Sequence, residues 1–302
     1  MPLAELAALL PPVEGVAVEL VSFPKVLDSS AIVPADWLEM ASLCRQLSQD
    51  VDGLVLVHGT DTLAFTSSAL SFLLHDLPTP VVITGSQVPL SFDNNDAAKN
   101  YVDAVADAGS GQSGVRIVFG GRQVLGCRAR KLSSERWQAF GAPKLADEAP
   151  LVGTAEPSPL QMLGQDLNAI EPRVGLLYLH PGLSQAEIAA QIARTDQRAL
   201  VIAAYGVGNM LVDAQVIEAV ETAMANDKLL VLVSQCAHGS TQPGLYASSR
   251  GLPSGSIIDG ADMTIEAALT KLMVLLGNLP EAKAREMMAL NCAGELSAQA
   301  TA

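Results

Sequence analysis

The sequence predicts an α/β protein with a largely parallel sheet, and two observations carry this prediction. Short aliphatic runs recur along the chain, and they are continuously apolar rather than alternating. Strands that are covered on both faces, as in parallel sheets, have this pattern. Segments with the apolar spacing of an amphipathic helix lie between most of these runs, and such alternation is typical of α/β folds.

The expected elements follow in order along the chain. A short helix comes first, between Pro2 near its start and Pro11 after its end. Strands are expected at 53–58, 80–84, 115–119, 174–180, 199–204 and 229–234. Helical patterns occupy 62–75, 96–108, 184–195 and 213–226. The segment GGRQVLGCRARKLSS at 120–134 breaks the alternation and predicts a hairpin or a similar strand-rich excursion.

The domain organisation is predicted from length and from one irregular stretch. The chain has 302 residues, and the stretch 141–172 is rich in Pro and Gly without a sustained period. We therefore expect a larger N-terminal domain at 1–150, whose mostly parallel sheet is flanked by helices. A linker at 151–172 and a smaller C-terminal parallel α/β domain at 173–302 are expected to follow.

Composition excludes several classes of function. The formal net charge of −14 argues against nucleic-acid binding, which needs clustered Lys and Arg. No apolar run reaches the ~18 residues of a membrane span, and the first residues lack the basic start of a signal peptide. The four cysteines and four histidines are scattered without a C-x-x-C pair, so we expect no metal and no disulfide framework. Reduced cysteines fit a cytoplasmic location.

Small and polar residues follow the expected strands. The strand ends read HGTDT at 58–62, TGSQ at 84–87 and YGVGN at 205–209. Ligands of open α/β sheets bind at the carboxyl ends of the strands. Because neither G-x-G-x-x-G nor G-x-x-x-x-G-K occurs, a nucleotide cofactor is not expected. The pattern favours a small polar molecule.

Two interpretations of HGTDT stay open on the residues alone. Thr60 and Asp61 stand where a helix begins, so they could cap its first N–H groups. They could instead face a pocket as a hydroxyl and an acid, where the hydroxyl would need a base to remove its proton. Lys131 could be that base, or a solvated charge beside two arginines.

The motifs resemble the bacterial asparaginase family, specifically its cytoplasmic type I branch. HGTDTLAFTSSALSF at 58–72 and ITGSQVPL at 83–90 carry the resemblance, together with DGADMTIEAALTKL at 259–272. It covers about residues 18–295 and implies a two-domain α/β amidohydrolase that converts L-asparagine to L-aspartate and ammonia. It further implies that no cofactor is needed and that the protein is a homodimer or homotetramer.

The resemblance also implies roles for particular residues. Thr60, Asp61 and Lys131 match the family's catalytic set, and Asp61 also matches the acid that holds the substrate's α-ammonium group. Asp28 and Ser29 match the segment that grips the α-carboxylate, and Gly59 belongs to the same motif as Thr60. Asn209 matches a residue that reaches a neighbouring subunit's site, although it could equally be a turn residue.

One motif of the family is missing from the sequence. Asparaginases carry another active threonine in a T-G-G-T-I motif at the end of their first strand, ahead of the segment that matches Asp28, and no such motif occurs here. We expect that the sequence starts at an internal Met of a longer protein. The alternative is a natural variant that keeps the fold without full activity. For the chain as printed, we expect weak or no turnover.

Two other functions remain as alternatives to the amidohydrolase. An asparaginase-like shell could bind an amino acid without hydrolysing it, because Asp61 and Ser29 would suffice for weak recognition. The chain could also be the asparaginase-like part of an amidotransferase that feeds ammonia to glutamyl-tRNA. The acidic balance disfavours this last function.

Overall fold

The computed structural model describes residues 3–25, 27–145, 157–242 and 251–297. It divides into two compact units, Met1–Ala142 and Pro143–Ala302. The units are similar in length, so the expected contrast between a larger first and a smaller second domain is not seen. The domain limits at 150 and 172 stay a prediction. Residues 151–156 of the expected linker lie outside the described residues.

The first unit holds a four-stranded sheet in the order β1-β2-β3-β4. The first three strands are parallel, and β4 returns antiparallel to β3. The strands are β1 Leu54–Val57, β2 Val81–Thr84, β3 Val115–Phe119 and β4 Arg122–Leu125. A small antiparallel pair follows, β5 Arg130–Lys131 with β6 Phe140–Gly141. The strand-rich excursion expected after the third strand is therefore confirmed.

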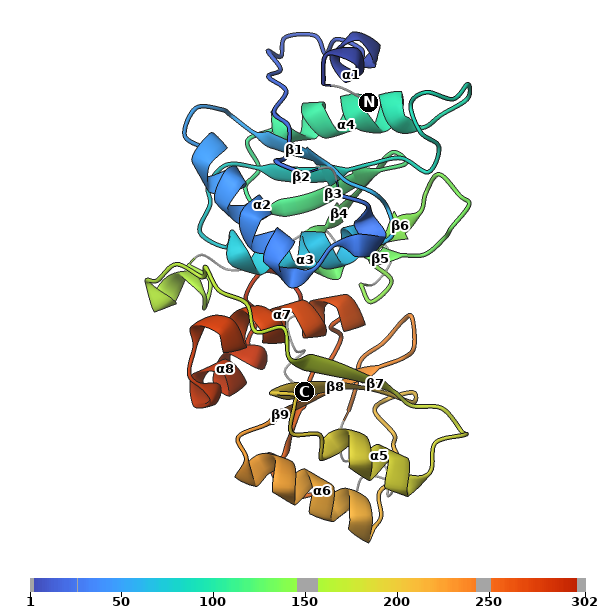
Figure 1. Cartoon of the computed structure of the whole chain (residues 1–302), viewed down its shortest axis with the longest axis vertical. Helices are drawn as coiled ribbons and strands as arrows, with labels where there is room; N and C mark the ends of the chain where they lie inside the picture. The colour runs from blue at the N-terminus through green and yellow to red at the C-terminus, as the bar shows by residue number, and fades with distance from the viewer. Residues whose placement is uncertain (1–2, 26, 146–156, 243–250, 298–302) are drawn as a thin grey trace. The chain divides into compact units, whose positions relative to one another are not determined.

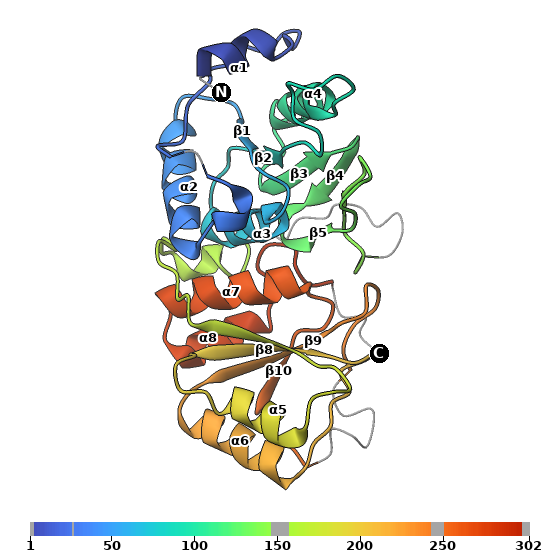
Figure 2. The same cartoon turned by 45° about the vertical axis from the view of Figure 1, so that its right-hand side comes forward.

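Helices cover both faces of this first sheet. Figures 1 and 2 show α4 on one face and α3 on the other, with α2 beside α3. The helices of the unit are α1 Leu3–Leu9, α2 Pro34–Leu47, α3 Leu63–Leu73 and α4 Ala97–Ala108, with short 3-10 turns η1 Ser29–Ala31 and η2 Gly126–Arg128. Helix α3 is buried on all sides because its small Ala and Ser residues allow close packing.

The second unit holds a sheet of four parallel strands in the order β10-β9-β8-β7. They are β7 Val174–Tyr178, β8 Ala199–Ala204, β9 Leu229–Ser234 and β10 Ile257–Asp259. Helices α5 Gln185–Ile192 and α6 Ala214–Ala225 cover one face, and α7 Ile265–Asn278 with α8 Glu281–Met288 cover the other (Figure 1). A 3-10 turn, η3 Gln161–Leu163, precedes β7.

Burial of the edge strands differs from the expectation of strands covered on both faces. The inner strands β8 and β9 are buried throughout, as expected. Strand β7 alternates instead, with Leu176 and Tyr178 exposed, and Val57 at the end of β1 is 67% exposed. An edge strand has a sheet neighbour on one side only, so its apolar run alone does not fix how much of it is covered.

A buried ion pair ties the end of the second unit to α7. The side chains of Lys271 and Glu295 are both fully buried, with Nζ and Oε1 2.6 Å apart. Lys271 also donates to the carbonyls of Met288 (3.0 Å) and Leu290 (2.6 Å), and Glu295 accepts the backbone N–H of Cys292. Each charge is thus paired and hydrogen-bonded, as buried charges require.

Candidate functional site

The loop between β1 and α3 holds the HGTDT residues at the carboxyl end of the sheet. Helix α3 begins at Leu63, and its N-cap residue Thr62 makes no side-chain capping bond. The Thr62 hydroxyl donates instead to the carbonyl of Ser29, at 2.6 Å. Thr60 and Asp61 lie ahead of the cap and turn toward another segment, so the capping interpretation of these two residues is wrong.

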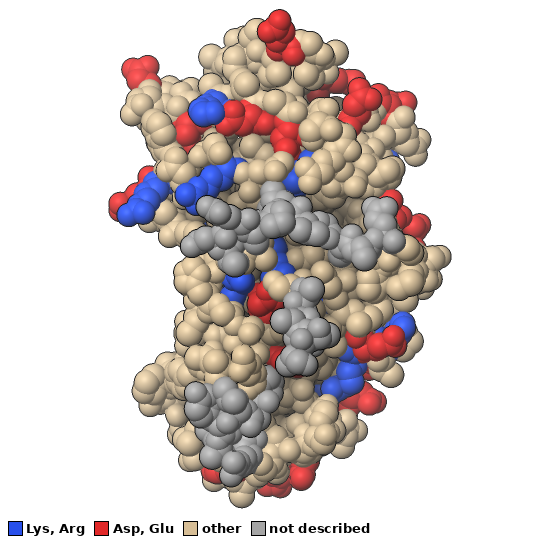
Figure 3. All heavy atoms as spheres, turned by 180° about the vertical axis from the view of Figure 1, so that it is seen from behind, with Lys and Arg blue, Asp and Glu red and all other residues tan. Residues whose placement is uncertain are grey.

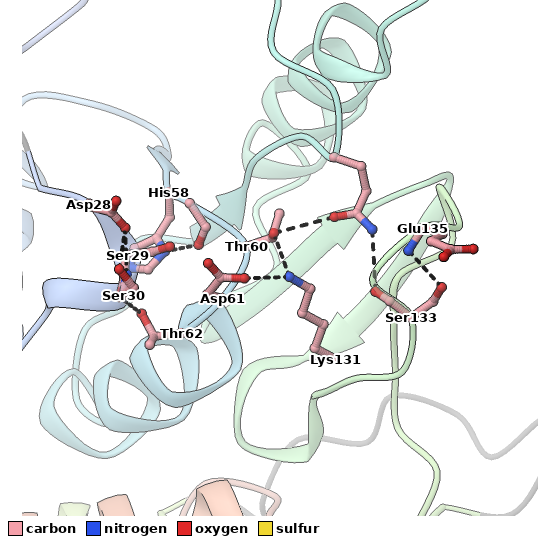
Figure 4. Close-up of polar contacts among 12 residues, drawn as sticks. Asp28, Ser29, Ser30, His58, Thr60, Asp61, Thr62, Lys131, Ser133 and Glu135 are labelled. Carbon is pink, nitrogen blue, oxygen red and sulfur yellow. Dashed lines mark hydrogen bonds and ion pairs between the residues drawn. The ribbon is translucent and has the colours of Figure 1, made fainter.

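Lys131 lies at the centre of the polar cluster drawn in Figure 4. Its Nζ is 2.8 Å from Thr60 Oγ1 and 2.8 Å from Asp61 Oδ1. The Lys131 side chain is 23% exposed, whereas that of Asp61 is 64% exposed. Lys131 is positioned by the short strand β5, which pairs with β6 so that Lys131 lies opposite Phe140. The interpretation of Lys131 as a solvated surface charge is therefore wrong.

Gln87 is a further member of this cluster that the sequence analysis did not single out. Its Nε2 donates to the carbonyls of Ser133 (3.4 Å) and Arg136 (3.3 Å). Carbonyls can only accept, so Oε1 must face the other way, and there it accepts the Thr60 hydroxyl at 3.4 Å. The backbone N–H of Gln87 is held by the buried carboxylate of Asp96 at 3.1 Å.

These directions fix how the Thr60 hydroxyl can act. When Lys131 is an ammonium it donates to Thr60, and the hydroxyl proton points to Gln87. When Lys131 is a neutral amine it can accept that proton across 2.8 Å while still donating to Asp61. The 3.4 Å bond to Gln87 is long and therefore weak, so little is lost when the proton turns toward Lys131.

Asp28 and Ser29 lie on the side of Thr60 that faces away from Ser133 and Glu135 (Figure 4), and Gly59 packs against Ser29. Asp28 Oδ1 accepts the backbone N–H and the hydroxyl of Ser30, and these bonds lower the pKa of the Asp28 carboxyl. Ser29 is buried. Gly59 packs so closely on Ser29 that a Cβ at this position would lie 2.5 Å from Ser29 Oγ. Glycine is required here by space.

His58 organises the buried side of the same loop. Its Nδ1 lies 2.6 Å from the carbonyl of Gly59, so Nδ1 carries the proton and Nε2 accepts the Thr66 hydroxyl at 3.0 Å. Trp37 Nε1 in turn donates to Thr66 Oγ1. Burial lowers the pKa of His58, so the ring stays neutral. Sequence offered one signal for this role, a histidine ending an otherwise aliphatic strand directly before glycine.

Asn209 is placed in the second unit, in a turn after β8. Its backbone exchanges hydrogen bonds with Tyr205, from Tyr205 N–H to Asn209 O (3.0 Å) and from Asn209 N–H to Tyr205 O (2.8 Å). The turn interpretation therefore fits its backbone, while a role toward a neighbouring subunit stays a prediction. The cluster brought together in the first unit comprises Ser29, Gly59, Thr60, Asp61 and Lys131.

Charge and ligand types limit what the described residues can bind. On the face shown in Figure 3, basic side chains are dispersed among acidic ones rather than gathered in one broad basic surface. The described residues contain no group of three His, Cys, Asp or Glu side chains that could hold a metal ion. Within the same residues, none of the helices has the length and apolarity needed to span a bilayer.

Comparisons with known proteins give matches along most of the chain. Residues 2–156 match the family model "Asparaginase, N-terminal", and residues 173–288 match "Glutaminase/Asparaginase C-terminal domain". L-asparaginase 1 of Escherichia coli K12 is 34% identical over 283 residues, covering 91% of this chain and 83% of the relative.

Two further relatives define the breadth of the family. The thermostable L-asparaginase of Thermococcus kodakarensis has a structure with a TM-score of 0.86 and 31% identity, covering 98% of this chain and 92% of that one. A component of the glutamyl-tRNA(Gln) amidotransferase of Thermoplasma acidophilum is 32% identical over 89% of this chain and 67% of its own length. With both family models matched along most of its length, the chain belongs to the asparaginase family.

Proposed function

We propose that this protein hydrolyses the side-chain amide of L-asparagine to L-aspartate and ammonia, with Thr60, Asp61 and Lys131 as catalytic residues. The observation that supports the proposal most is the contact of one lysine amine with both a hydroxyl and a carboxylate, at 2.8 Å each. Relatives of this chain that are named L-asparaginase support the choice of substrate.

The chemistry begins with removal of a proton. A threonine hydroxyl is a poor nucleophile until a base accepts its proton. Lys131 accepts it when its amine carries no extra proton, while Asp61 holds the amine in place. The pair activates either the Thr60 oxygen itself or a water molecule that this oxygen holds. The activated oxygen attacks the amide carbonyl carbon, the C–N bond breaks, and the proton on Lys131 passes to the leaving nitrogen, which departs as ammonia. If water attacks, L-aspartate forms directly. If Thr60 attacks, a water molecule then hydrolyses the Thr60 ester, which releases L-aspartate and restores the Thr60 hydroxyl.

Substrate binding is proposed to use the exposed groups around this pair. Asp61 uses Oδ1 toward Lys131, and within the described residues its Oδ2 has no hydrogen-bond partner. That oxygen is proposed to hold the α-ammonium group through a charge-assisted bond. Ser29, which follows Asp28 in sequence and packs against Gly59, is proposed to hold the α-carboxylate. Asn209 is proposed to complete the site of a neighbouring subunit.

The decisive experiment measures ammonia release and binding separately. The complete product of the gene is assayed with L-asparagine and L-glutamine, and binding of L-asparagine and L-aspartate is followed by calorimetry. We expect ammonia from L-asparagine and its loss in Thr60→Ala and Lys131→Met. Thr195 is exposed, and Lys283 is half-buried and, among the described residues, paired only with Glu286 of its own helix, so Thr195→Ala and Lys283→Met are matched controls outside the proposed site and should keep the rate. Binding of asparagine without any turnover would refute hydrolysis and favour an amino-acid-binding module.

A separate experiment identifies the attacking nucleophile. Mass spectrometry of protein quenched during turnover detects an ester on Thr60 if this oxygen attacks, and detects none if a water molecule attacks.

We also propose a cytoplasmic homodimer or homotetramer. Cell fractionation tests the location, and light scattering at assay concentrations tests the assembly.

A further inference from the structure

A polar hollow lies in the first unit, and two of its lining residues, Leu132 and Ser133, directly follow Lys131. It has a volume of about 500 Å³ and is lined by Arg122, Leu132, Ser133, Arg136 and Gln138. Arg122 comes from β4, and the other four come from the segment that follows Lys131. None of these residues belongs to the set proposed to bind or hydrolyse L-asparagine.

The two arginines of this hollow differ from the other described arginines of the chain. Arg122 and Arg136 have no ion pair or side-chain hydrogen bond within 3–25, 27–145, 157–242 and 251–297. Every other arginine in those ranges has a hydrogen-bond or ion-pair partner. These paired arginines are Arg45, Arg116, Arg128, Arg130, Arg173, Arg194, Arg198 and Arg285. In a chain with a net charge of −14, carboxylates are plentiful. Both guanidinium groups are exposed and line the same hollow, so they are available to an anion from solution.

The remaining polar groups of the hollow also favour an anion. Ser133 Oγ accepts the backbone N–H groups of Glu135 (3.1 Å) and Arg136 (2.9 Å), which leaves its O–H free to donate. The Gln138 amide donates to the Gly120 carbonyl at 3.4 Å. Glu135 is the acidic neighbour in this segment, and it forms no ion pair with either arginine.

The two ends of the segment are tied together before any ligand arrives, because the Leu132 N–H donates to the Ala139 carbonyl at 2.7 Å. Gln87 Nε2 donates to the carbonyls of Ser133 and Arg136, at 3.4 and 3.3 Å, and the Gln87 backbone is anchored by Asp96. Restricting the segment in advance reduces the entropy that binding would otherwise cost. Guanidinium groups present planar pairs of N–H donors that match the oxygens of carboxylates and phosphates.

We propose that the hollow lined by Arg122, Ser133 and Arg136 is a binding site for a small oxyanion with two negative charges. A dicarboxylate and inorganic phosphate share this chemistry. Both anions can bridge two guanidinium groups while accepting the Ser133 hydroxyl.

Calorimetric titration of the full chain with sodium phosphate and, separately, with sodium malonate tests the site at constant ionic strength. We expect saturable binding of at least one anion, and the stronger of the two identifies the ligand class. Arg122→Gln and Arg136→Gln should each weaken it about tenfold, because each removes one charge-assisted contact. Arg194→Gln removes an exposed arginine of the second unit and should leave the affinity unchanged.

The outcome is decided by the double variant. A titration curve that Arg122→Gln/Arg136→Gln leaves unchanged would place the anion elsewhere and overturn the proposal, as would the absence of saturable binding for both anions. Thermal unfolding provides an independent measurement. The bound anion should raise the unfolding midpoint of the unaltered chain and of Arg194→Gln, but not that of the double variant.

Discussion

The close contact between Gly59 and Ser29 allows a quantitative prediction. A Cβ on residue 59 would lie 2.7 Å from Ser29 Cβ and 2.5 Å from Ser29 Oγ. The oxygen could move by rotation, but the Cβ atom could not, and reaching an ordinary contact of 3.4 Å requires a shift of about 0.7 Å. A misplacement on the scale of 1 Å costs about 100-fold in rate. Overpacking costs about 1–3 kcal/mol of stability.

Gly59→Ala should therefore lower kcat/KM for L-asparagine between about tenfold and 100-fold. The assay follows ammonia release over a range of substrate concentrations, together with thermal unfolding of the same samples. Gly109→Ala is the matched control, since Gly109 has φ −75° and a Cβ there would meet only atoms at 3.6 Å or beyond. It should gain about 0.4–1 kcal/mol of stability and keep full activity. Unchanged kcat/KM and an unchanged midpoint in Gly59→Ala would refute the packing argument.

Three more predictions concern the network around Thr60. Burial lowers the pKa of His58, so the unfolded chain binds a proton that the folded chain does not. The free energy of unfolding should therefore fall as the pH drops below about 6.5, by up to about 1.4 kcal/mol per pH unit. His58→Gln should flatten the slope of the unfolding free energy against pH, measured by denaturant titrations between about pH 5 and 7.5. The same slope in both proteins would argue against a role for His58 in this pH dependence. Gln87→Leu removes three long hydrogen bonds together, to the Thr60 hydroxyl and to the Ser133 and Arg136 carbonyls, and should lower kcat/KM about tenfold. Gln112→Leu, at an exposed position, should not. The two Asp96 oxygens accept the backbone N–H groups of Gln87 and Val88, so Asp96→Asn turns its NH2 group toward one of these donors. It should cost about 1–3 kcal/mol in the free energy of unfolding, which a normal melting curve would contradict.

The strands were predictable because their apolar runs are bounded by polar and glycine residues. The run at 81–84 is buried in full, and the expected strand at 80–84 matches β2 to within one residue. Strand β10 was not predicted, since Ile257–Asp259 has only three residues and no pattern is visible over that length. Helix α2 was also not assigned. It begins at Pro34, as first helical turns often do, but its buried face includes the charged Asp36.

The candidate site was predictable only where a motif matched a family. Lys131 is 71 residues away from Thr60 in sequence, and its strand has two residues, so neither periodicity nor spacing could bring them together. The family resemblance suggested the pair. Gln87 and His58 could not be assigned roles from residue type, because their contributions depend on which atom donates and which accepts. The direction of these hydrogen bonds is known only from the folded structure.

The buried pair of Lys271 and Glu295 has a consequence for how the protein is synthesised. In a chain that ends before residue 295, a folded second unit would bury the Lys271 ammonium without its carboxylate partner. An unpaired buried charge destabilises by about 3–5 kcal/mol, a large part of the roughly 5–15 kcal/mol that holds a typical domain folded. Translation products that stop short of this glutamate would therefore leave the second unit loosened and exposed to cellular proteases.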